Sequence, residues 1–141
     1  MSLKLPRIFV SDLFKLSSDW YDFYCNFYNY KCFGDVIPRF GRDAELDTSN
    51  LFHVHLAMSP EVENTWVNQK QRYLRTTLVD SPDLDYWLIY AKDDFTGDYL
   101  LLTIVGPDAH DRLKWTPLYN TLHSDFVIPW INGRVTYEEP D

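Results

Sequence analysis

A chain of 141 residues with 45% hydrophobic and 17% aromatic residues is long enough to bury a core and too apolar to be disordered. Its net charge of −8 disfavours general nucleic-acid binding, because contacts to phosphates need lysine and arginine. The charge is uneven, since residues 1–75 hold nine basic and nine acidic side chains and the excess lies in residues 76–141. We expect a single domain over residues 1–141, with room for a basic surface in its first half.

The ends of the chain and its two cysteines indicate a cytoplasmic protein. No apolar run approaches the ~20 residues of a membrane span, and MSLKLPRIFV lacks the hydrophobic segment of a signal peptide. Cys25 and Cys32 would lie roughly 10 Å apart along a helix, which is too far for a disulfide. We expect two buried free thiols, and no contact with a membrane.

The first half of the chain predicts one long helix flanked by less regular segments. Residues 7–16 fit a strand with a turn at its end, or a short helix. SSDWYDFYCNFYNYKCFG follows, and it predicts a helix that Ser18 or Asp19 caps and Gly34 ends. One helical face carries Trp20, Phe23, Tyr24, Phe27 and Tyr30 or Lys31. Residues 34–50 contain Gly, Pro and Asp breakers and are typical of a structured loop.

The second half predicts strands and a final helix. LFHVHLAM is a strand, residues 60–74 contain a short helix, and LRTTLVD starts another strand. YWLIYA and YLLLTIV form a hairpin through the turn DDFTGD, and their continuous apolar character indicates central strands. TPLYNTLHSDFVIPWI is a helix with Pro117 in its first turn and Pro129 at its end. Helices followed by antiparallel strands predict an α+β fold.

Nine of the twelve acidic residues of the second half are expected to lie in solvated loops. They are Asp80, Asp83, Asp85, Asp93, Asp94, Asp98, Glu138, Glu139 and Asp141.

The pair His53 and His55 poses the main functional question. Side chains alternate across a strand, so the two imidazoles point to the same face. Such a pair can take part in proton transfer, bind a metal ion, or form hydrogen bonds on a half-exposed sheet.

Four patches of the sequence together resemble the YafO family of bacterial toxins, the mRNA interferases of type II toxin–antitoxin modules. The first patch matches at Tyr30, Lys31, Gly34, Pro38, Phe40, Gly41, Arg42, Asp43, Ala44 and Asp47. The second is the strand HVHLA, residues 53–57. The third is Arg75-Thr76 after Tyr73, and the fourth is an apolar hairpin closed by Pro107, Asp108 and His110.

The resemblance implies a compact RelE-like fold, with N-terminal helices packed on an antiparallel sheet and a C-terminal helix. It also implies ribosome-dependent endonuclease activity on mRNA, which inhibits translation, and a cognate antitoxin protein as partner. The cleavage that it implies is metal-independent general acid–base catalysis and needs no cofactor.

The residues for such a reaction are present in the chain. Cleavage of RNA without a metal needs a base for the 2′-hydroxyl, an acid for the leaving 5′-oxygen, and cations for the phosphate charge. Our candidates for catalysis are His53, His55, His110 and Arg75. Our candidates for substrate binding are Arg42, Lys70, Arg72, Tyr73 and Tyr90, in which the tyrosines would stack on a base or hydrogen-bond the phosphate.

Structural roles remain open for most of these residues. Arg42 can pair with Asp43 or Asp47 and hold its loop together. His110 follows a Pro-Asp-Ala turn and can serve as a turn or cap residue. We expect the remaining histidine, His123, on the surface of the last helix.

Two other function classes remain open. The histidines of residues 53 and 55, with His110 and a carboxylate such as Asp108 or Asp43, could form the metal centre of a small hydrolase or oxygenase. The chain could instead be an acidic binding protein without enzymatic activity, whose interface is Asp93, Asp94 and Asp98.

Overall fold

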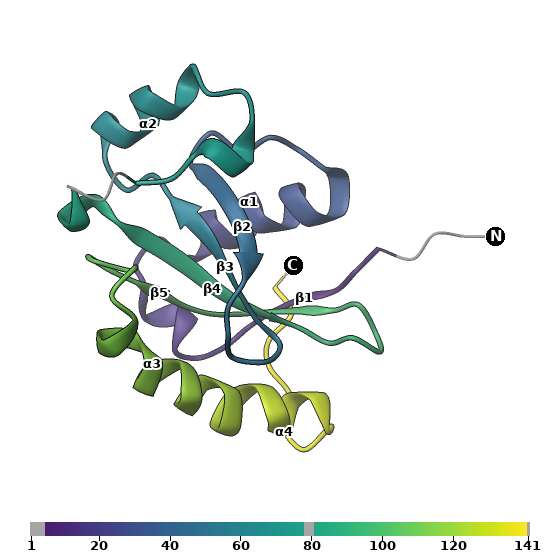
Figure 1. The fold of residues 1–141 in the computed structure, drawn as a ribbon. Helices are drawn as coiled ribbons and strands as arrows, with labels where there is room; N and C mark the ends of the chain where they lie inside the picture. Colours follow the sequence, from purple (N-terminus) through teal and green to yellow (C-terminus); the bar gives the residue numbers. More distant parts are fainter. Residues whose placement is uncertain (1–4, 78–80, 141) are drawn as a thin grey trace.

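The fold is an open five-stranded sheet with helices on both faces (Figure 1). The structure is a computed structural model that describes residues 5–77 and 81–140. The strand order is β1-β5-β4-β3-β2, and only β1 runs parallel to its neighbour, β5. The strands are β1 (Ile8–Val10), β2 (Phe40–Glu45), β3 (Leu51–Leu56), β4 (Tyr86–Lys92) and β5 (Tyr99–Val105). The α+β class predicted from the sequence is confirmed.

Helix α1 (Trp20–Phe33) covers one face of the sheet, as its aromatic stripe predicts. Its buried residues pack against strand residues of that face, among them Val54 and Leu88. Asp19 stands at the N-cap, although its side chain makes no capping hydrogen bond. Gly34 ends the helix with a φ of 70°, a conformation that costs glycine little.

The other face is covered by the C-terminal helices α3 (Arg112–Thr121) and α4 (Ile128–Ile131). A turn of wider π-type helix, Leu122–Val127, joins them. Their apolar residues pack on Ile89, Ala91 and Leu100. The two histidines of β3 line a hollow on this face together with residues of α3, among them Arg112 at its start.

The predicted start of the last helix was wrong, as was the prediction that Pro129 ends it, whereas the predicted segment does end at Ile131. The helix begins at Arg112, because the Asp111 side chain accepts a hydrogen bond from the Lys114 N–H and caps it. Pro117 therefore lies inside the helix instead of in its first turn. Pro129 does not end the helix, which continues to Ile131; the π-type turn precedes this proline, whose missing N–H interrupts the regular ladder.

The prediction of a loop over residues 34–50 was also wrong, because strand β2 lies within this range. This strand is at the edge of the sheet and pairs with β3 alone, with an irregular register between Phe40 and Asp43. A bulge disrupts the alternation of buried and exposed side chains along an edge strand, so such a strand is difficult to predict from the sequence pattern. The strand predicted to start in residues 74–80 is absent from the described part, since Arg72–Leu74 forms a 3-10 turn and residues 75–77 are irregular. Residues 78–80 lie outside the described residues.

Gly41 allows the segment after α2 (Pro60–Val67) to pack tightly on β2. A Cβ atom at Gly41 would lie 2.3 Å from the carbonyl oxygen of Arg75 and 2.9 Å from the Trp66 ring. We expect Gly41→Ala to lower the free energy of unfolding by about 1–3 kcal/mol, measured by urea denaturation. The control Gly133→Ala has no atom within 4 Å of its Cβ and should report only the strain of its φ of 75°. A smaller loss for Gly41→Ala than for the control would contradict this packing.

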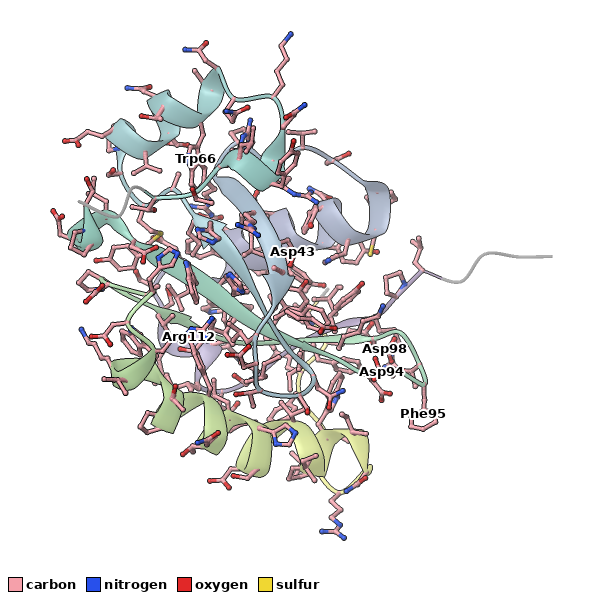
Figure 2. All side chains as sticks on the ribbon, viewed as in Figure 1. Asp43, Trp66, Asp94, Phe95, Asp98 and Arg112 are labelled. Carbon is pink, nitrogen blue, oxygen red and sulfur yellow. The ribbon has the colours of Figure 1, made fainter. Side chains whose placement is uncertain are left out.

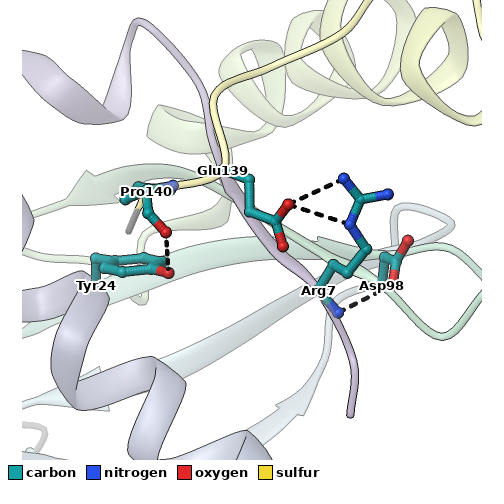
Figure 3. Close-up of polar contacts among 5 residues, drawn as sticks. All are labelled: Arg7, Tyr24, Asp98, Glu139 and Pro140. Carbon is teal, nitrogen blue, oxygen red and sulfur yellow. Dashed lines mark hydrogen bonds and ion pairs between the residues drawn. The ribbon is translucent and has the colours of Figure 1, made fainter. Parts of the chain in front are cut away.

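The N- and C-terminal segments lie side by side (Figure 3). The Arg7 guanidinium donates to Glu139 Oε1 from Nη2 at 2.9 Å and from Nε at 3.2 Å, while the Tyr24 hydroxyl donates to the Pro140 carbonyl at 2.9 Å. Val10 also bridges to Glu138 through main-chain atoms. The acidic tail is therefore attached to the fold, while Glu138 and Glu139 remain exposed to solvent, as the sequence predicted. Asp141 lies outside the described residues.

The burial of the two cysteines agrees only in part with the sequence prediction. Cys25 and Cys32 are free thiols, but both are half-buried instead of fully buried. No helix among the described residues is both long and apolar enough to cross a membrane.

Candidate functional site

His53 and His55 lie next to each other on the sheet face that carries α3, with His55 opposite Trp87 on β4. The two imidazole rings are 5.2 Å apart, and the Trp87 ring lies 4.1 Å from His53 and 5.3 Å from His55. His53 is 9% exposed and His55 2%. The alternation predicted from the sequence is confirmed. Both rings are buried, so the alternative of two polar side chains on a half-exposed face does not fit.

His110 reaches the same place from the segment between β5 and α3. Its ring centroid lies 5.4 Å from that of His55 and 4.7 Å from that of Trp87. Its side chain remains 54% exposed, so it stands where the buried histidine pair meets solvent. The structure thus brings together the three histidines that the sequence predicted as one site.

Asp85 pairs with His110, and the sequence did not predict this contact. Asp85 Oδ2 forms a short hydrogen bond with His110 Nδ1. It also accepts a hydrogen bond from the His110 main-chain N–H at 2.9 Å. The Asp85 side chain is 3% exposed, so its expected place in a solvated loop was wrong. A buried carboxylate on Nδ1 fixes the orientation of an imidazole and leaves Nε2 for other chemistry.

The three histidines and Trp87 line a hollow of about 540 Å³ that opens to solvent. Arg42 from β2 and Arg112 from the start of α3 contribute cationic side chains to its wall. Figure 2 labels Arg112, whose guanidinium is paired with Asp47 at 2.6 Å. Further lining residues are Ala44, Glu45, Leu46, Thr48, Thr76, Thr77, Ala109, Thr116 and Tyr119. A second hollow of about 610 Å³ lies between α1 and the C-terminal tail, and its lining has neither histidine nor arginine.

Buried polar atoms without partners gather at the histidine hollow. Among the described residues, seven buried side-chain nitrogen or oxygen atoms have no hydrogen-bond partner. Six of them belong to residues that line the hollow or pair with one that does, namely His53, His55, Thr77, Asp85, Trp87 and Tyr119. A buried polar atom without a partner costs about 1–3 kcal/mol. Their concentration in one place indicates a site that offers hydrogen bonds to a ligand.

Burial keeps the two strand histidines neutral at pH 7. It lowers the pKa of His53 to about 4, with the Ala44 main chain and Asp43 opposing the shift. Burial and then the neighbouring His53 lower the pKa of His55 to about 3. An imidazole with so low a pKa can accept or donate a hydrogen bond, but at pH 7 it is both a weak base and a poor proton donor in catalysis. The half-exposed His110 is therefore better placed for proton transfer.

Arg75 lies outside this hollow. It is 6% exposed, and its guanidinium donates to main-chain carbonyls, from Nε to Gln69 at 2.8 Å and from Nη1 to Phe40 at 3.3 Å. These bonds join β2 to the segment that follows α2. The local sequence around Arg75 contains no signal for a carbonyl that lies 35 residues away along the chain.

We expect Arg75→Lys to lower stability while leaving the chemistry of the folded fraction unchanged. Lysine keeps the charge but lacks Nε, so the Gln69 carbonyl loses its donor, at a cost of about 1–3 kcal/mol. Urea denaturation measures the loss. A large drop in activity per folded molecule, with stability unchanged, would restore Arg75 to a catalytic role.

The remaining predicted substrate-binding residues also lie away from the histidines. The Arg72 guanidinium lies 4.4 Å above the ring of Tyr30, and the exposed Tyr73 donates its hydroxyl to Gln71 Oε1 at 2.9 Å. Lys70 is exposed near them. The three residues lie in the segment that follows α2, and none of them lines the histidine hollow.

Tyr90 lies on the opposite face of the sheet, under α1. Its hydroxyl donates to Asp43 Oδ1 at 2.6 Å, and the Tyr30 hydroxyl donates to Asp43 Oδ2 at 2.6 Å. Lys31 Nζ lies 2.9 Å from Asp43 Oδ2 and completes the network. Figure 2 labels Asp43. Asp43 is therefore engaged by Lys31 and two tyrosines, and Asp47 by Arg112. Neither acid is paired with Arg42, which leaves that side chain on the wall of the hollow.

The acidic hairpin turn is partly structural. Asp93 is 8% exposed and accepts the Phe95 N–H at 2.9 Å, and Asp98 accepts the Arg7 N–H at 3.0 Å. Asp94 is exposed at the tip of the turn beside Phe95 (Figure 2). The expectation that these acids are all solvated was wrong for Asp93.

The fold and the hollow define a small α+β protein with a solvent-open histidine site. The sequence model of a family described as toxin YafO, type II toxin–antitoxin system, matches residues 14–126, which include every histidine of the hollow. Because the match covers well over half of the chain, the protein belongs to the YafO toxin family, and this membership implies a cognate antitoxin partner. No curated protein and no solved structure matches the chain.

Proposed function

We propose that this toxin is a ribosome-dependent mRNA endonuclease of the cytoplasm, with a RelE-like fold, and that the histidine hollow is its active site. The observation that carries the proposal is the His110–Asp85 pair at the mouth of a hollow where six buried polar atoms lack partners. Membership in the toxin family supports the biological role, and the geometry supports acid–base chemistry on a polar, anionic substrate.

His110 is the general base of this proposal. Asp85 holds the ring through Nδ1, so Nε2 accepts the proton of a ribose 2′-hydroxyl while the 2′-oxygen attacks the neighbouring phosphorus. The bond from phosphorus to the 5′-oxygen then breaks, and that oxygen takes a proton from water or from a group of the ribosome. The products are a 2′,3′-cyclic phosphate and a 5′-hydroxyl end.

Arg42 and the buried histidines bind the substrate. Arg42 supplies a planar cation for the phosphate oxygens, whose charge grows in the transition state. His53 and His55 are neutral and present ring nitrogens to the ribose or phosphate as hydrogen-bond partners. Lys70, Arg72 and Tyr73 lie on another surface, and we assign them to contacts with the ribosome or with RNA outside the cleaved bond.

The experiment is induced expression in bacteria with mapping of mRNA 5′ ends. Wild type should arrest growth and generate new mRNA ends, and a drug that blocks translation initiation should remove these ends. His55→Gln should lose both effects, whereas His123→Gln, at the fourth histidine, should keep them. Well-folded wild type that causes neither arrest nor cleavage would refute the proposed activity.

A further inference from the structure

Three residues from separate segments meet where the histidine hollow opens to solvent. His55 comes from β3, Asp85 from the turn before β4, and His110 from the segment before α3. Each offers one ligand atom, and these three atoms all lie within 4.8 Å of one another. No other group of three such side chains is found among the described residues.

Two of the three residues are buried with an unused polar atom. His55 and Asp85 are each 2% exposed, and neither His55 Nδ1 nor Asp85 Oδ1 has a hydrogen-bond partner within the described chain. A buried carboxylate oxygen without a donor is costly, and a bound cation would remove that cost. The unpaired atoms are thus a second observation, independent of the spacing, that points to a ligand here.

The chemistry of the three ligands selects the type of ion. Two imidazoles and one carboxylate suit Zn²⁺ and similar transition metals, whereas Mg²⁺ and Ca²⁺ prefer oxygen ligands alone. Tetrahedral zinc holds its ligand atoms roughly 3.4 Å apart, given bonds of about 2.0–2.1 Å. The half-exposed His110 side chain can make the small adjustment that this requires. The Arg42 guanidinium on the wall opposes a cation, and the buried Asp85 carboxylate favours it.

We propose that His55, Asp85 and His110 form a site for one divalent transition-metal ion of the Zn²⁺ type, with a fourth position open to solvent. The binding itself does not depend on the proposed function. The consequence of binding does depend on the proposed function. If His110 is the general base, a metal ion on its ring prevents the proton transfer, so zinc would inhibit the nuclease.

Calorimetric titration of the untagged, chelator-stripped full chain with ZnCl₂ tests the site. We expect one Zn²⁺ per chain, no binding of Mg²⁺, and a melting temperature that rises by roughly 5 °C or more at hundredfold excess over Kd. His110→Gln should weaken binding at least tenfold, as should Asp85→Asn. His123→Gln is the matched control and should bind as wild type does. Cobalt absorbance gives the coordination geometry of the same site.

Folding and function are separable in this test. His110→Gln changes a half-exposed side chain, and circular dichroism verifies that each variant is folded. Absence of stoichiometric Zn²⁺ binding in wild type, or wild-type affinity in folded His110→Gln, would overturn the metal site and leave the proposed nuclease untouched. Zinc binding by a chain that cleaves no mRNA would refute the nuclease and support the metal site.

Discussion

His110→Ala is expected to reduce mRNA cleavage by roughly 10²–10⁴-fold, the usual contribution of one general acid or base. The fold should survive, because the side chain is 54% exposed and the main-chain N–H of residue 110 still donates to Asp85. The measurement is the initial rate of cleavage of a translated mRNA by purified protein on ribosomes, with a zinc-selective chelator present.

His123→Ala is the control for this variant. It removes an imidazole from the last helical segment, outside the hollow, and should cleave at the wild-type rate. Asp85→Asn should show a smaller loss than His110→Ala, because the amide oxygen can still accept a hydrogen bond from Nδ1–H but no longer stabilises a positive charge on the ring. Wild-type cleavage by folded His110→Ala would remove His110 from the mechanism.

The second large effect is a loss of stability in acid that originates in His53 and His55. An unfolded histidine has a pKa near 6.5, whereas burial lowers the pKa of folded His53 to about 4 and of folded His55 to about 3. The unfolded chain therefore binds more protons than the folded chain in this interval. The contribution of the two histidines to the free energy of unfolding is fully present above pH 6.5. It is lost as the pH falls toward 4 and below, by on the order of 3 kcal/mol for His53 alone.

Urea denaturation at a series of pH values, with chelator, measures this effect. The charges facing the pair are those of Asp43, Arg42 and His110, and they are the same in wild type and in His55→Gln. The variant should therefore lose less stability per pH unit between 6.5 and 4, whatever its stability at neutral pH. Parallel curves for the two proteins would contradict the burial of a neutral His55.

Local patterns were sufficient for the elements that carry a strong repeat or a specific end residue. The aromatic spacing and Gly34 predict α1, and two apolar runs around a polar turn predict the β4–β5 hairpin. The edge strand β2 and the start of α3 were missed. The first has a bulge that breaks its alternation, and the second depends on a cap at Asp111 that competes with the helix-start signal of Pro117.

The candidate site was predictable only where the residues share one strand. His53 and His55 are fixed together by strand alternation, and the family resemblance adds His110. Asp85 pairs with a residue 25 positions away, and nothing in its acidic surroundings separates it from the exposed Asp83. The position of Tyr90 could be predicted only from the pairing register of the strands, because its place opposite Phe52 puts it on the sheet face away from the histidines. Such contacts follow from the fold and have no local sequence signal.

The most direct test of the histidine site is the chemistry of the new mRNA ends. Transfer of the 2′-hydroxyl proton to His110 and attack by the 2′-oxygen leave a 5′-hydroxyl on the downstream fragment. We predict 5′ ends that become ligatable only after treatment with a polynucleotide kinase, in wild type and not in His110→Ala. Ends that carry a 5′-phosphate, or 5′-hydroxyl ends that persist at the wild-type level in His110→Ala, would contradict acid–base cleavage in this hollow.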